Sequence, residues 1–194
     1  PDLVSPFTLG VSSAAAFGAS VCIVWGNAMF HSTIGMIIGA FLASCVCIIL
    51  VYSLSMLTSG AVSALVLTGI AMNYFFSALS ASIQFFAQEY KLGEIIQWTF
   101  GTLSKATWTA TGITFGVLFF SIIIYYIFAL RLDAMAINDD ETVKSLGINP
   151  EKVRWIVGFV SVLLTATVIS FTGVIGFVGL IAPHIARMII GNEH

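Results

Sequence analysis

The sequence predicts an all-α, polytopic membrane protein, and three features of its composition carry that prediction. Charged residues make up only 8% of the 194 residues, whereas soluble domains carry about 25%. Hydrophobic residues make up 59%, and the mean hydropathy is +1.05. No Asp, Glu, Lys or Arg occurs from Leu3 to Gln88, a run that holds several membrane spans of about 20 residues. The net charge of -2 argues against a nucleic-acid partner, because phosphate neutralisation needs clustered Lys and Arg.

Six apolar windows follow one another along the chain and predict six membrane crossings. All but the last approach the length that a helix needs to span a hydrocarbon core of about 30 Å. Turn-forming residues separate them. The windows are residues 7–25, 34–57, 62–87, 108–130, 155–172 and 177–190.

Small residues four positions apart predict close helix packing, because helices in lipid associate through near backbone contact. This spacing occurs within three of the windows. The residues concerned are Gly10, Ala14, Gly18, Gly35, Gly39, Ala43, Gly112 and Gly116.

Nine of the sixteen charged residues lie in one loop, residues 131–154. Lys and Arg are enriched in cytoplasmic loops, whereas acidic residues have little influence on orientation. With six crossings the basic residues divide unequally between the two sides of the membrane. Arg131, Lys144, Lys152, Arg154 and Arg187 share one side, and Lys91 and Lys105 lie on the other. We therefore expect the 131–154 loop to face the cytoplasm.

The middle of this loop predicts a short helix, a glycine turn and the start of a second helix. Asn138 and Glu141 fit a capping box, so the first helix should cover about residues 139–146. Gly147 supplies a left-handed stop. The pair at 149–150 is an N-cap followed by proline, which favours a new helix that enters the membrane.

Two interpretations of this segment remain open. Val143 and Leu146 beside the charges would form a compact knob that docks in a partner's groove. Alternatively, the segment is a solvated loop.

A second unusual stretch covers residues 173–187. Glycines three apart, followed by a proline, break helical continuity at membrane depth, as some transporters do. These residues are Gly173, Gly176, Gly179 and Pro183; His184 and Arg187 follow three apart on one helix face. Asn73 is a polar residue within a crossing, and it either lines a pathway or bonds to a neighbouring helix.

The sequence lacks the motifs of several function classes. There is no phosphate-binding loop, no His-Glu-x-x-His and no Gly-x-Ser-x-Gly, so we expect no catalytic residue, no metal site and no cofactor. Carboxylates, which ion-coupled carriers use as buried proton or sodium sites, are missing from the six windows. A secondary carrier and a structural membrane protein nevertheless stay open as alternatives.

Five ordered stretches resemble the FecCD-like permeases of ABC importers for iron-siderophores and vitamin B12. They are PDLVSPFTLGVSSAAAFG at 1–18, LVLTGIAMN at 65–73, WTFGTLS at 98–104, SLGIN at 145–149 and GVIGFVGLIAPHIAR at 173–187. The resemblance implies a type II ABC importer permease bundle. It also implies that residues 1–194 form one transmembrane permease domain, a fragment matching roughly the third to eighth helices of the family.

The resemblance further implies residue roles. The cytoplasmic ATPase would dock on Asp139, Asp140, Glu141, Val143, Lys144, Leu146 and Gly147. The cytoplasmic gate would include Ser59 and Ser63, and the translocation path would include Asn73 and Ser77.

The implied partners are an ABC ATPase subunit that hydrolyses ATP, an extracytoplasmic substrate-binding protein near residues 89–105 and a second permease copy. The implied location is the plasma membrane. The implied cargo is a ferric siderophore, with cobalamin or haem as close alternatives.

Overall fold

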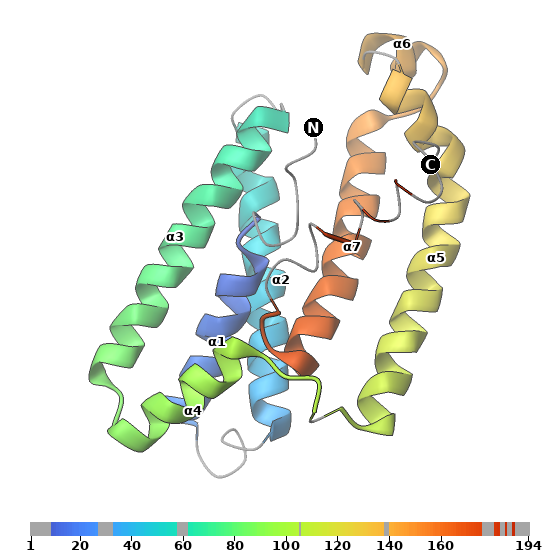
Figure 1. Ribbon diagram of the computed structural model, residues 1–194. Coiled ribbons are helices and arrows are strands. Elements are labelled where there is room, and N and C mark those ends of the chain that lie inside the picture. The colour runs from blue at the N-terminus through green and yellow to red at the C-terminus, as the bar shows by residue number, and fades with distance from the viewer. Residues whose placement is uncertain are drawn as a thin grey trace.

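A computed structural model describes residues 9–26, 33–57, 62–104, 106–137, 140–175, 181–182, 185 and 188. The described part is all-helical (Figure 1). Its helices are α1 (Val11–Trp25), α2 (Thr33–Leu57), α3 (Val62–Phe86), α4 (Glu89–Phe100), α5 (Trp108–Ile137), α6 (Asp140–Ser145) and α7 (Pro150–Thr172).

Four of the described helices, α2, α3, α5 and α7, are long and apolar enough to cross a membrane. They correspond to the second to fifth predicted windows, which are thereby confirmed as helices. α5 continues seven residues past its predicted end, because Leu, Ala and Met after Arg131 favour helix.

The first predicted crossing is a shorter helix than expected, and the last lies mostly outside the described residues. α1 begins at Val11 rather than at residue 7, so its 15 residues rise only about 22 Å. It is therefore shorter than the predicted crossing and falls short of a hydrocarbon core of about 30 Å. The window at 177–190 lies mostly outside the described residues.

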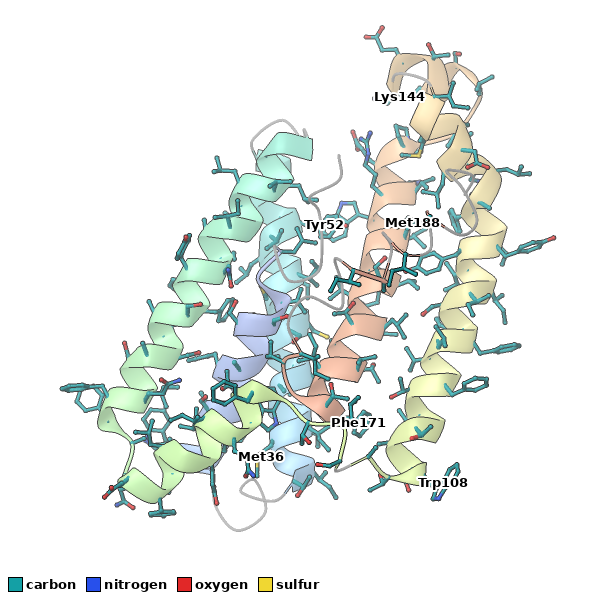
Figure 2. All side chains as sticks on the ribbon, in the orientation of Figure 1. Met36, Tyr52, Trp108, Lys144, Phe171 and Met188 are labelled. Carbon is teal, nitrogen blue, oxygen red and sulfur yellow. The ribbon has the colours of Figure 1, made fainter. Side chains whose placement is uncertain are left out.

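The bundle has two chemically different ends. α6 lies at one end, here called the inner end, and α4 lies at the opposite, outer end (Figure 1). Figure 2 places Lys144 at the inner end and Trp108 at the outer end. Trp108 is 93% exposed, as expected for a tryptophan at a membrane interface. The loop with most basic residues thus lies at the end opposite Lys91 on α4, which matches the predicted division of the basic residues.

The central helix of the described bundle is α1, which contacts α2, α3, α4 and α7. A Cβ atom on Gly18 would overlap the carbonyl oxygen of Gly39 and lie 2.7 Å from Ala43 Cβ. The predicted close packing is therefore confirmed at Gly18, Gly39 and Ala43, whereas Gly10 precedes α1 and lies against Asn73 of α3. Gly112 and Gly116 on α5 have no described atom within 4 Å of such a Cβ, so the third predicted face makes no such contact here.

Helices α5, α6 and α7 form a hairpin whose second arm joins the rest of the bundle. α5 packs mainly on α7, where Tyr125 Oη and Ser161 Oγ lie 2.7 Å apart. α7 in turn packs on α2, and the ring centroids of Tyr52 and Trp155 lie 4.7 Å apart. The Tyr52 hydroxyl also lies against Gly158, in space that a side chain there would fill. α7 therefore connects the inner-end tip to the α1–α2–α3 core.

Candidate functional site

The predicted inner-end knob is present as a short helix and a glycine turn. α6 covers Asp140–Ser145, and Gly147 adopts the left-handed region with φ +80°. The backbone N–H of Gly147 donates to Lys144 O over 3.0 Å. Asn149 then caps α7, its Oδ1 accepting from the N–H of Lys152 over 3.1 Å. Local capping chemistry thus fixes the knob, residues 140–149, at the tip of the α5–α7 hairpin.

The knob divides its two apolar side chains between inside and outside. Val143 has no exposed surface, and Leu146 is 62% exposed. The prediction that Val143 is presented to a partner is therefore wrong. Val143 points inward because α6 packs between the ends of α5 and α7, and an apolar side chain has to fill that junction.

The exposed part of the knob combines one apolar side chain with charges. Glu141, Lys144 and Leu146 are exposed, so a partner surface would meet an apolar centre beside two opposite charges. Asp140 is described only as a helix position, and Asp139 lies outside the described residues.

Asn73 on α3 faces α1 and bonds to it. Its Oδ1 accepts a hydrogen bond from Ser13 Oγ, which also approaches Gly10 O at 3.1 Å. Gly10 has φ +77°, and a Cβ there would lie 2.8 Å from the backbone nitrogen of Asn73. Of the two interpretations left open for Asn73, the bond to a neighbouring helix is the one that the structure contains.

We expect replacement of Asn73 by alanine to lower stability modestly. Interhelical hydrogen bonds in membranes contribute about 0.6 kcal/mol on average and at most about 1.7 kcal/mol. Thermal unfolding in detergent, with Ser77→Ala as the exposed control on the same helix, measures this. An Asn73→Ala protein as stable as the control would show that the bond to Ser13 contributes nothing.

Ser77 lies on the exposed surface of α3, here called its open face, one helical turn after Asn73. This face carries small residues among aromatic and aliphatic ones, namely Leu67, Ile70, Ala71, Tyr74, Ser77, Ala78, Ala81, Ser82 and Phe85. α3 is also the least hydropathic of the four membrane-capable helices. Ser59 lies outside the described residues, and Ser63 is described only as a helix position.

The predicted helix break begins as expected at Gly173, which ends α7 with φ +73°. The residue lies against Gly101 of the α4 C-terminus, which has φ +66°. The backbone N–H of Thr102 donates to Thr172 O over 2.7 Å. Other residues of the predicted motif, Gly176, Gly179, Pro183, His184 and Arg187, lie outside the described residues.

The sequence analysis did not predict α4, the helix whose C-terminus places Gly101 against Gly173. Its signals were present: Glu89 stands in the first turn, and Leu92 and Ile95 repeat three apart on the inward face. Within the described ranges no group of His, Cys, Asp or Glu could hold a metal ion.

Comparisons with known proteins agree over nearly the whole chain. The model of the FecCD transport family matches residues 2–194. A Methanocaldococcus jannaschii protein, provisionally named an ABC transporter permease, is 38% identical over 99% of this chain and 57% of its own length. A Helicobacter pylori protein, provisionally named an iron chelatin transport system permease, is 33% identical over 97% of this chain and 56% of its own.

A solved structure is similar across the whole chain. It is described as an inward-facing conformation of a provisionally assigned metal-chelate type ABC transporter. The match has a TM-score of 0.87 at 30% identity and covers 100% of this chain and 61% of that one. The chain thus spans just over half the length of the curated relatives that it matches.

Proposed function

This chain belongs to the FecCD transport family, and on that premise we propose that it forms the membrane-spanning part of an ATP-driven importer. The observation that carries the proposal is the knob: a capped, exposed tip on a hairpin of two membrane-capable helices, in a chain that matches the family almost from end to end. ATP would be hydrolysed on a separate ABC ATPase subunit. Residues 1–194 would act as one permease domain within a longer permease.

The knob is the proposed ATPase contact. Leu146 would enter an apolar groove of the ATPase, with Glu141 and Lys144 at its rim. Val143 and Gly147 would hold the shape of the knob from within, since one is buried and the other forms the turn. Asp139 and Asp140 would add negative charge beside it.

The translocation path is proposed to run along the open face of α3. A membrane helix that faces only lipid needs an apolar surface, and the Ser77 side of α3 is instead partly polar. A second permease copy would supply the opposite wall, with the gate at Ser59 and Ser63. A substrate-binding protein would deliver cargo at the outer end, near α4.

The proposed cargo is a metal chelate, foremost a ferric siderophore, with cobalamin or haem as alternatives. A neutral path lined by Ser, Ala and aromatic side chains suits a bulky chelate, because it offers no carboxylate ligands to a bare ion. In the described membrane helices, Asp, Glu, Lys and Arg occur only near the inner ends of α5 and α7. This weighs against a carrier driven by buried proton or sodium sites.

Ser77→Trp tests the path. We expect uptake of ferric siderophore to fall sharply while the thermal unfolding temperature stays at the wild-type value, because residue 77 is exposed. Leu118→Trp on the exposed surface of α5 is the matched control and should transport normally. Normal uptake by the Ser77→Trp permease would remove this face of α3 from the path.

A further inference from the structure

Helix α7 reaches from the knob to the outer end of the bundle. Its 23 residues, Pro150–Thr172, rise about 34 Å, so the helix joins the proposed ATPase contact to the α4 region (Figure 1). The contacts at each end of α7 therefore decide which part of the helix moves when the knob is displaced.

The outer end of α7 is held by direct contact between backbones. A Cβ on Gly173 would overlap Trp98 O and lie 2.8 Å from Gly101 Cα, and a Cβ on Gly101 would lie 2.9 Å from Val174 O. The hydrogen bond from Thr102 N–H to Thr172 O closes the contact. Because both sides are backbone, no side chain can rotate to give way.

Packing reinforces this outer contact. The Trp98 and Val174 side chains pack on a buried cluster made by Ala15, Ala19, Ala40 and Ile169. α4 is itself tied to α1, where Lys91 Nζ donates to Val24 O over 2.7 Å. The outer end of α7 is thus attached to a unit that comprises α4 and the central helix.

The inner half of α7 has fewer buried residues than its outer half. Six of the eight buried residues of α7 lie from Val160 onward, and only Pro150 and Val153 are buried before it. Its contact with α2 runs through the Tyr52 ring against Trp155 and Gly158. An aromatic side chain can reorient about its own torsions, whereas the Gly101–Gly173 contact cannot.

We infer that the Gly101–Gly173 crossing is a pivot, which fixes the outer end of α7 so that displacement of the knob swings the inner end of the helix. The inference rests on the proposed function, since it supposes that an ATPase moves the knob. Gly101 and Gly173 are then positioning residues, which convert motion at the ATPase into motion at the α2 and α3 side of the bundle.

Gly101→Ala tests the pivot in the complete permease assembled with its ATPase and binding protein in proteoliposomes. We expect ATP hydrolysis to persist at the wild-type rate while ferric siderophore uptake per ATP falls strongly. A purely structural defect would lower both together. Gly112→Ala, the same change at a position with open space, should leave the ratio unchanged.

Distances in the transport-competent protein give a second test that needs no disruptive variant. Spin labels at Gln97 and Ile175 report the outer end, and labels at Glu151 and Leu67 report the inner end. We expect ATP binding to change the inner distance and leave the outer one constant. A change in the outer distance, or an unchanged inner distance, overturns the pivot. Equal uptake per ATP in the Gly101→Ala and Gly112→Ala proteins also overturns it.

Uptake by the wild-type protein distinguishes failure of the proposed function from failure of the pivot. Absence of ATP-driven uptake in wild type would contradict the proposed function and the pivot with it. Normal wild-type uptake with failed pivot tests would contradict the pivot alone.

Discussion

Replacement of Gly18 by leucine is expected to abolish folding of the permease. The site has no room, because a Cβ alone would overlap Gly39 O and lie 2.7 Å from Gly39 C and Ala43 Cβ. Inserting a side chain into a packed interface typically costs about 1–3 kcal/mol. Here the obstacle is backbone, so α1 and α2 have to separate along their contact and the cost should exceed that range.

The measurement is the yield of monodisperse protein in detergent, followed by thermal unfolding. Gly116→Leu is the matched control, because no described atom lies within 4 Å of its Cβ position. We expect the control to resemble wild type and Gly18→Leu to give aggregated protein. Equal yields and unfolding temperatures for the two variants would contradict the close contact between α1 and α2.

Leu146→Asp is expected to abolish ATP-driven uptake without affecting membrane insertion or stability. Leu146 is 62% exposed at the tip of the knob, so an aspartate there leaves internal packing unchanged. It would place a charge where the proposed ATPase groove needs an apolar side chain, and burying an unpaired charge is prohibitive.

Leu103→Asp provides the control for this second variant. Leu103 is 67% exposed and follows α4 at the outer end, so the same substitution there adds the same charge on the opposite side. Thermal unfolding is measured for both variants. Uptake in proteoliposomes is compared between Leu146→Asp and wild type, because Leu103 lies in the region where the substrate-binding protein is proposed to dock. Wild-type uptake by Leu146→Asp would exclude Leu146 from the ATPase contact.

The membrane helices and the knob were predictable because their signals are local. Uncharged runs of sufficient length define α2 and α3, and the Gly147 turn and Asn149 cap define the C-terminal side of the knob. The predicted cap at Asn138 lies outside the described residues. These features depend on neighbours within a few residues, which a single sequence displays.

The remaining features depend on which helices meet. Glycines four apart predict close contact equally for Gly18 and for Gly112, yet only Gly18 has a facing helix in the described structure. The inward direction of Val143 likewise follows from packing between α5 and α7. The residues of the Gly101–Gly173 crossing are far apart in the chain, and spacing within either segment carries no information about the other.

Co-purification of the complete permease with candidate ABC ATPase subunits is the decisive measurement. We predict that wild type and Leu103→Asp retain the ATPase through affinity purification and size exclusion, and that Leu146→Asp loses it while remaining folded. Failure of wild type to retain the ATPase would contradict the proposed importer function, and undiminished retention by Leu146→Asp would exclude Leu146 from the ATPase contact.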